Sequence, residues 1–230
     1  MTAPEPYWSD GTCTLYLGDC RAITEWLAAD VLCTDPPYGR RWRQGGTLRS
    51  SRGRPSVSNG HDGIAGDLDT SVRDDALRLW GGRPGIVFGD LMLPPPCGTR
   101  QVLPYLKAQD AGARGATGGF RRDAEAVYLT GPWLSGIGGR SSLLVTSAPI
   151  QGGEHGVAAR YGHPHAKPLD VMETLITACP PGVIADPFAG SGSTLIAARN
   201  LGRRAIGVEL EERYCEKAAR RLSQMVLEVC

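Results

Sequence analysis

The most constraining stretch of this sequence is residues 31–39, in which a short apolar run is separated by only two residues from two consecutive prolines. Residues 31–33, Val-Leu-Cys, have the length and composition of a buried strand. Pro36 and Pro37 fix φ and lack a backbone N–H, so regular structure cannot continue through them. We therefore expect a stiff loop at the carboxyl end of a strand, where open α/β sheets bind their ligands.

This loop groups a carboxylate, an unpaired carbonyl and an aromatic ring, supplied by Asp35, Pro36 and Tyr38. Two acceptors beside a ring suit a planar base with an exocyclic amino group, because both amino hydrogens need acceptors and the base needs a stacking partner. The alternative is a proline-rich turn in which Asp35 caps a neighbouring element. The tetrapeptide alone favours neither interpretation.

A second stretch, residues 183–194, has the pattern of a strand, a glycine loop and the start of a helix. The glycines allow close approach of the backbone to a ligand, and we expect Ser193 or Thr194 to cap a helix over residues 194–201. Residues 204–210 predict another strand. Glu209 ends it about 20 residues beyond the glycine loop, where nucleotide-binding folds place an acceptor for ribose hydroxyls.

Taken together, these motifs make the chain resemble the amino-group DNA methyltransferases that use S-adenosylmethionine. The resemblance extends from about Cys13 to Tyr214 and is weakest between residues 133 and 161. It implies that the early motif is catalytic, with Asp35, Pro36, Pro37 and Tyr38. It implies that the late motif binds the cofactor, with Asp186, Phe188, Ala189, Gly190, Ser191, Gly192 and Glu209.

The order of the motifs is circularly permuted, with the catalytic loop first, as in the beta subgroup of these enzymes. The resemblance implies an α/β, Rossmann-like methyltransferase fold, with a mostly parallel seven-stranded sheet and helices on both faces. The 230 residues suffice for one such domain. We divide it into a catalytic half (13–130), a small target-recognition insert (131–162) and a cofactor-binding half (163–230). Because the insert is small, a homodimer would extend the contact with DNA.

Hydrophobic patterning predicts the remaining elements. Residues 1–10 are expected to form a loose arm. We expect strands at residues 12–20, 86–90, 101–107, 126–129 and 142–146, and helices at 21–28, 67–80, 169–178 and 211–229.

Two further residues are expected at the cofactor on the strength of the resemblance. Asp19 ends the first predicted strand, where related enzymes bind the adenine amino group of the cofactor. Its alternative role is to cap the following helix. Lys167 belongs to a lysine–proline motif that lies beside the methionine end of the cofactor in the family. The nearby His163 and His165 lack further partners in register, so a zinc site is not expected.

Residues 40–61 are rich in arginine and contain no acid. One interpretation is a solvated, disordered loop. The other is an arm that neutralises DNA phosphates beside the catalytic loop, with a tryptophan available for stacking. The residues expected to contact DNA on that interpretation are Arg41, Trp42, Arg43, Arg49 and Arg52.

Composition adds limits rather than a function. The formal net charge is +1, so any basic footprint must come from local clustering. The seven cysteines include no Cys-x-x-Cys pair, so neither a metal site nor a disulfide framework is predicted. No apolar run approaches the length of a membrane span and no leader is evident. We therefore expect a cytoplasmic protein without metal or membrane partner.

The expected reaction is transfer of a methyl group to the exocyclic nitrogen of a base flipped out of double-stranded DNA. Asp35 and the Pro36 carbonyl would accept the amino hydrogens, and Tyr38 would stack on the base. Within the family an Asp at the first motif position favours adenine N6, and cytosine N4 is the alternative. An RNA methyltransferase, a glutamine-modifying protein methyltransferase and a catalytically silent DNA-binding protein remain further alternatives.

Overall fold

The computed structural model describes residues 4–41, 64–107, 117–134, 136, 138–146 and 166–227. Its centre is a sheet of nine strands in the order β1-β2-β9-β8-β3-β4-β6-β5-β7. The strands are β1 (Trp8–Ser9), β2 (Cys13–Leu17), β3 (Val31–Thr34), β4 (Gly85–Gly89), β5 (Thr99–Leu106), β6 (Ala124–Thr130), β7 (Leu144–Val145), β8 (Ile184–Asp186) and β9 (Ala205–Glu209). The helices are η1 (Glu25–Ala28), α1 (Ser71–Trp80), α3 (Leu169–Ala178), α4 (Ser193–Asn200) and α5 (Glu212–Leu227).

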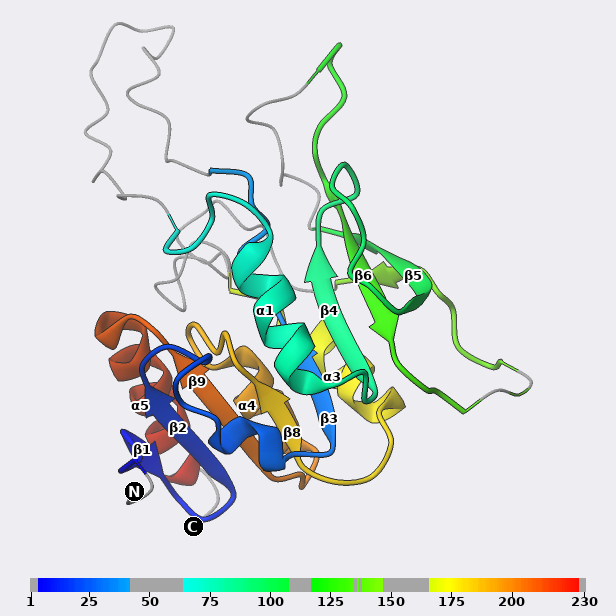
Figure 1. The fold of residues 1–230 in the computed structure, drawn as a ribbon. Helices are drawn as coiled ribbons and strands as arrows, with labels where there is room; N and C mark the ends of the chain where they lie inside the picture. The colour runs from blue at the N-terminus through cyan, green and yellow to red at the C-terminus, as the bar shows by residue number, and fades with distance from the viewer. Residues whose placement is uncertain are drawn as a thin grey trace, which may run out of the picture.

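Five neighbouring strands, β2, β9, β8, β3 and β4, run parallel. Strand β6 runs antiparallel between β4 and β5, and β1 is antiparallel at the far edge. Because parallel strands end at the same edge of a sheet, the residues that follow β2, β3, β8 and β9 come together there. This explains how the two sequence motifs, which are far apart in the chain, meet at one edge of the sheet (Figure 1).

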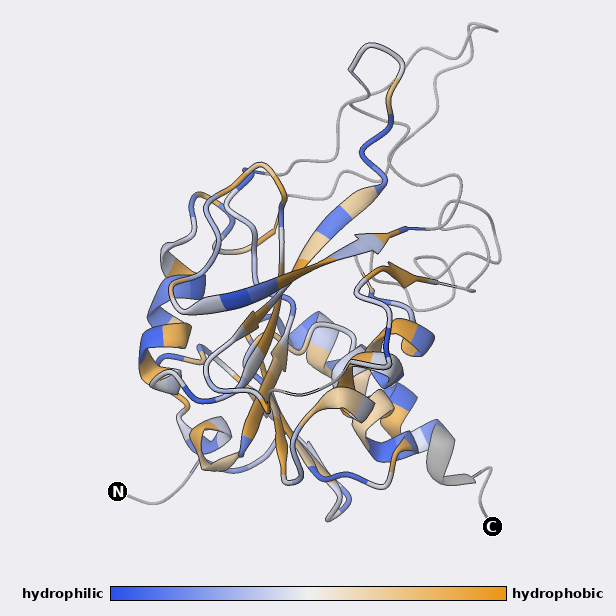
Figure 2. Cartoon of the chain, turned by 90° about the vertical axis from the view of Figure 1, so that its right-hand side faces the viewer, coloured by the Kyte–Doolittle hydropathy of each residue, from blue (hydrophilic) through white to orange (hydrophobic). Residues whose placement is uncertain are grey.

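Helices cover both faces of the sheet, as predicted. Helices α3, α4 and α5 pack on one face, where the core contains side chains such as Ile86, Ile176 and Leu195. Helix α1 and the short 3-10 helix η1 pack on the other, around Leu32, Val87 and Tyr128. The strands between these layers are strongly apolar (Figure 2). Burial on both faces is why the central strands are nearly continuous apolar runs.

The predicted number of strands, seven, is wrong, because two-residue strands extend the sheet at each edge. Strand β7 lies within the predicted run 142–146 and pairs with β5. Strand β1 lies in the stretch predicted as a loose arm. Asp10 accepts hydrogen bonds from the backbone of Thr12 and Cys13 and closes a turn that folds Trp8 and Ser9 back onto β2.

Several element boundaries also differ from the prediction. Helix α3 was predicted correctly, whereas the helix expected at 21–28 is only the 3-10 helix η1. Helix α4 starts one residue earlier than predicted, with Gly192 as its N-cap and no side-chain capping bond. The predicted cap by Ser193 or Thr194 is therefore wrong. Gly192 has φ +82°, a conformation that glycine adopts without strain.

Two stacked tryptophans anchor the face that carries α1. The Trp26 and Trp80 ring centroids are 5.9 Å apart, both side chains are buried, and Trp26 Nε1 donates to the Cys20 carbonyl at 2.9 Å. Arg83 lies over the Trp80 ring and donates to the carbonyls of Leu27 and Ala29. This cluster fixes η1 and α1 beside β3, the strand that leads into Asp35.

Replacing Trp26 with Ala should lower the free energy of unfolding by about 3–5 kcal/mol, because a large buried ring is removed and its cavity cannot fully collapse. Urea unfolding followed by circular dichroism measures this loss. The half-exposed Leu201 serves as the control, as Leu201→Ala. A loss no larger than that of the control would contradict a structural role for the tryptophan pair.

Candidate active site

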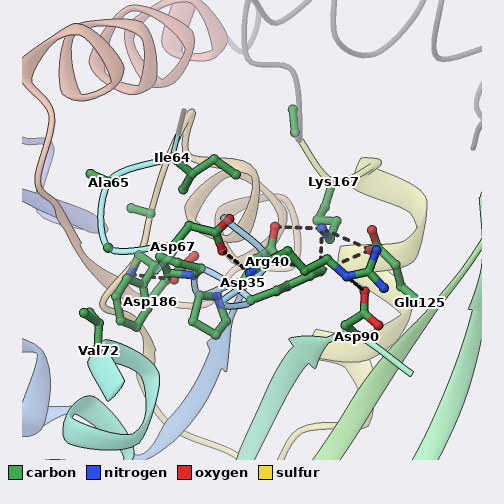
Figure 3. A pocket seen from close by; sticks show the side chains of 18 of the residues that line it. Asp35, Arg40, Ile64, Ala65, Asp67, Val72, Asp90, Glu125, Lys167 and Asp186 are labelled. Carbon is green, nitrogen blue, oxygen red and sulfur yellow. Dashed lines mark hydrogen bonds and ion pairs between the residues drawn. The ribbon is translucent and has the colours of Figure 1, made fainter. Parts of the chain in front are cut away.

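The two sequence motifs line one cavity of about 910 Å³ at the carboxyl ends of the parallel strands. Asp35, Pro36, Pro37 and Tyr38 line one part of it, and residues 186–191 and Glu209 line another. Figure 3 shows the labelled side chains of Asp35, Lys167, Glu125 and Asp186 gathered at this cavity. The structure therefore brings together the predicted catalytic and cofactor residues.

The Asp35 carboxylate is held by two groups. Tyr38 OH donates to Asp35 Oδ1 at 2.8 Å, and Lys167 Nζ lies 2.7 Å from Asp35 Oδ2. The side chain of Asp35 remains 22% exposed, toward the cavity. Burial raises the pKa of Asp35 above its ordinary value, while the ammonium of Lys167 acts in the opposite direction.

Lys167 is itself buried and all three of its donors have acceptors. Besides Asp35, its Nζ lies 3.2 Å from Glu125 Oε2 and donates to Tyr38 OH at 3.1 Å. Burial alone would lower the pKa of Lys167, but the facing carboxylates of Asp35 and Glu125 raise it. The lysine is therefore charged, and its described contacts are with Asp35, Tyr38 and Glu125 rather than with the glycine loop.

Glu125, at the start of β6, completes this cluster together with Lys107. Lys107 Nζ lies 2.5 Å from Glu125 Oε1, and both side chains are largely buried. Burial alone would raise the pKa of Glu125, but Lys167 and Lys107 lower it to about 2. Two carboxylates and two ammonium groups thus alternate and balance in charge. Such pairing is what makes buried ions tolerable.

Sequence reasoning missed Glu125 and Lys107 as functional residues. The signal that was present was weak: an acid at the start of one strand and a lysine at the end of the strand beside it. Register alone brings them together, since Tyr105 pairs with Glu125 and Leu106 with Ala124 on adjacent antiparallel strands.

Two further acids that were not predicted, Asp67 and Asp90, bind the residues that follow Tyr38 and so clamp this loop. Asp67 Oδ1 accepts hydrogen bonds from the backbone N–H of Gly39 at 2.7 Å and of Arg40 at 3.2 Å. The Arg40 guanidinium forms an ion pair with the largely buried Asp90 after β4. Gly39 has φ +81°, and a Cβ there would lie 2.6 Å from a backbone atom of Asp69. The loop conformation therefore requires glycine at this position.

The late motif forms a tight turn that is held by the carboxylates of Asp186 and Glu209. Asp186 Oδ1 accepts from Thr34 Oγ1 at 2.6 Å and from the Phe188 N–H at 3.1 Å. Glu209 Oε2 accepts from the Gly190 N–H and Oε1 from the Glu211 N–H, both at 2.8 Å. Each Glu209 oxygen has a further lone pair for a ligand hydroxyl.

Ser193 supplies a test of whether this turn is built for a polar ligand. Its Oγ is buried, lines the cavity and has no hydrogen-bond partner among the described residues. Buried polar atoms in native proteins are normally satisfied, so an orphan beside a glycine loop indicates a place for a ligand. The donor and acceptor set fits a nucleoside cofactor.

The other predicted site residues are less clearly placed. Asp19 lines the cavity, but both of its oxygens accept from the Arg21 guanidinium, and Oδ1 also accepts the Arg21 N–H. Arg41 has φ +52°, and its Nε donates to the Leu68 carbonyl. Trp42, Arg43, Arg49 and Arg52 lie outside the described residues.

Comparison with known proteins identifies the family. The profile described as DNA methylase, N6_N4_Mtase, matches residues 103–220, which is just over half of the 230 residues. The chain belongs to this N6/N4 DNA methylase family. Its cofactor is S-adenosylmethionine. The matched residues include Lys107, Glu125 and the late motif, whereas Asp35 precedes them.

The chain is also similar to a curated relative in sequence and to two solved structures in fold. The putative methylase YubD of Escherichia coli K-12 is 28% identical over 213 residues, covering 90% of this chain and 88% of that protein. The structure of M1.HpyAVI with SAM has a TM-score of 0.56 at 18% identity, covering 91% of this chain and 99% of that one. The PvuII DNA methyltransferase, cytosine-N4-specific, has a TM-score of 0.60 at 14% identity, with coverages of 93% and 87%.

Two negative observations apply to the described part of the chain. None of its helices has the length and apolar character needed to cross a membrane. Nor does that part contain a cluster of three or more metal-ligating side chains.

Asp186 generates a prediction about stability and pH. Burial raises its pKa from 3.8 to about 6, so the folded state binds a proton more tightly than the unfolded state. Its contribution to stability is therefore complete at low pH and declines as the pH rises through about 6. Urea unfolding at a series of pH values should show a smaller decline in Asp186→Asn than in the wild type. Persistence of the full decline in Asp186→Asn would contradict the assignment, and the variant Asp75→Asn, at a partly exposed carboxylate, should decline as the wild type does.

Proposed function

We propose that the protein transfers the methyl group of S-adenosylmethionine to the exocyclic N6 of adenine in double-stranded DNA. The observation that carries this proposal is the shared cavity, in which Asp35 and Pro36 face the same space as the glycine loop and Glu209. A methyl donor held by the late motif and an amine held by the early motif would thus meet without rearrangement of the sheet.

The cofactor would be held by the late motif. Glu209 offers acceptors for ribose hydroxyls, and the glycine loop with Ser193 offers close backbone approach and an unused hydroxyl. We assign Asp186, Phe188, Ala189, Gly190, Ser191 and Gly192 to this loop. Asp19 would reach the cofactor only if it shares its oxygens with Arg21. When bound, S-adenosylmethionine supplies a methyl group activated by a sulfonium centre.

The catalytic loop would act on the amino group. The exocyclic nitrogen is a weak nucleophile because its lone pair is shared with the ring, and accepting its two hydrogens frees that lone pair. Asp35 and the Pro36 carbonyl are the acceptors. Tyr38 and Lys167 each occupy one lone pair on an Asp35 oxygen, which leaves a second on each for the substrate. A carboxylate fixed in this way also stabilises the positive charge that develops on the nitrogen.

Lys167, Glu125 and Lys107 would act as positioning residues. Lys167 orients Asp35 and favours its ionised form, against the effect of burial, which raises the pKa of this carboxyl. Glu125 holds Lys167 and the Tyr38 hydroxyl, and Lys107 holds Glu125. The expected contact of Lys167 with the cofactor stays a prediction, but its three donors are already matched to acceptors around Asp35. Tyr38, tethered through its hydroxyl, would present its ring to the flipped base.

The choice of adenine rests on Asp35, because within the family an Asp at this position is more usual for adenine than for cytosine. The PvuII enzyme, which shares the fold, is cytosine-N4-specific, so N4 of cytosine is the second candidate. Both amines present two hydrogens and suit the same acceptors.

A substitution in the early motif should impair methyl transfer, and a substitution in the late motif should impair cofactor binding. Asp35→Asn should leave S-adenosylmethionine affinity unchanged and lower the methyl-transfer rate by about 10²–10³-fold, because an acceptor aimed at developing charge is replaced by a donor. Glu209→Gln should weaken cofactor affinity, because its amide would face the backbone N–H of Gly190 or Glu211. Titration calorimetry and a transfer assay with labelled cofactor measure both. Equal loss of affinity in the two variants would refute the division of roles.

The methylated base can be identified directly. After incubation of the wild type with unmethylated duplex DNA and labelled cofactor, digestion to nucleosides and mass spectrometry should show N6-methyldeoxyadenosine. Asp35→Asn is the matched control and should give little product. N4-methyldeoxycytidine alone would overturn the choice of base and leave the amino-methylase function standing, whereas label only in RNA supplied in parallel would overturn DNA as the substrate.

A further inference from the structure

Residues 117–120, which lie between β5 and β6 and shortly before β6, form a tight turn. The N–H of Thr117 donates to the Phe120 carbonyl, and the N–H of Phe120 donates to the Thr117 carbonyl, both at 3.0 Å. Gly118 and Gly119 have φ +58° and +83°, the two positive values that a type I′ turn requires. This segment stands clear of the body, beyond the carboxyl ends of the parallel strands (Figures 1 and 2).

The turn presents an aromatic ring next to two cations. Phe120 is 82% exposed, which is unusual for a large apolar side chain on a well-defined turn. Arg121 and Arg122 follow directly and are also exposed. Arg121 lies 3.5 Å from Asp123, a surface pair that contributes little. Arg122 forms no ion pair with any residue in the described ranges.

This turn borders the active-site cavity. Thr117, Arg121 and Arg122 line the same cavity as Asp35 and Tyr38. The loop after β4 adds two more exposed apolar side chains to that lining, Leu91 at 51% and Met92 at 82%. The lining of the cavity near this turn therefore combines arginines with exposed apolar groups.

We propose that residues 117–122 form a contact for duplex DNA at the point where the target base leaves the helix. Arg121 and Arg122 pair with phosphates, and the Phe120 ring stacks on the bases that extrusion leaves exposed. Unstacking a base is costly, and apolar side chains inserted at a base step offset that cost. Arginines beside the ring favour a polyanion over an apolar protein partner. The inference rests on the proposed DNA substrate and adds a site that the catalytic loop does not contain.

Binding to DNA tests the contact without requiring catalysis. Fluorescence anisotropy is measured with a short, unmethylated, fluorescein-labelled duplex over a series of NaCl concentrations. Phe120→Ala should weaken affinity about tenfold, the order that one base–aromatic stack contributes, and Phe120→Trp should retain it. The double variant Arg121→Gln, Arg122→Gln should lower the slope of log K against log salt by about two. The controls are Leu79→Ala and Arg78→Gln on α1, both exposed and expected to leave affinity and slope unchanged.

Base extrusion tests the role of the ring. Once the methylated sequence has been mapped on unmethylated phage DNA, a fluorescent analogue replaces the target base. The wild type should raise its fluorescence, and Phe120→Ala at saturating concentration should reduce that rise while S-adenosylmethionine affinity by calorimetry stays constant.

The outcomes separate this inference from the proposed function. The inference alone would be overturned if the wild type methylates DNA but the variants at Phe120, Arg121 and Arg122 bind DNA with unchanged affinity and salt slope and give an unchanged rise in fluorescence. The stacking role alone would be overturned if the arginine double variant lowers the salt slope but Phe120→Ala binds DNA and extrudes the base as the wild type does. A wild type that binds no duplex DNA would overturn the inference together with the proposed substrate.

Discussion

The ammonium of Lys167, buried between the carboxylates of Asp35 and Glu125, is the interaction on which the site depends. It joins three segments that are remote in sequence: the loop after β3, the start of β6 and the approach to α3. Removing one partner of such a buried pair leaves an uncompensated charge, so each of these groups constrains the others. Lys107 extends the constraint to β5 through Glu125. The geometry of the Asp35 carboxylate is therefore set by the antiparallel end of the sheet as much as by its own loop.

A second interaction connects the two halves of the chain at the sheet. Thr34 Oγ1 on β3 donates to Asp186 on β8, across 152 positions of sequence. Strands β3 and β8 are direct parallel neighbours. Because the ends of parallel strands meet at one edge whatever their order along the chain, the permuted order of the motifs has no consequence for the assembled site.

The sequence allowed prediction of the fold class, the two motifs and the layers of helices. These depend on local patterns: buried apolar runs for β3 and β8, prolines at 36 and 37, and glycines at 190 and 192. It did not allow prediction of the two-residue strand β1, which exists because β2 offers a free edge, whereas β7 lies within the predicted run 142–146. Lys107, Glu125, Asp67 and Asp90 were missed because single charged residues carry no local pattern. Their importance comes from register and from contacts between distant segments.

The clamp formed by Asp67 and Asp90 has a consequence for how the loop that carries Asp35 is held. Arg41 N–H donates to the Asp67 carbonyl at 2.7 Å, and Asp67 also binds the backbone at Gly39 and Arg40. The chain on either side of residues 42–63 is thus tied together at the base. The position of the loop that carries Asp35 is therefore set by contacts among the described residues on both sides of this segment, through Asp67 and through the Arg40–Asp90 ion pair.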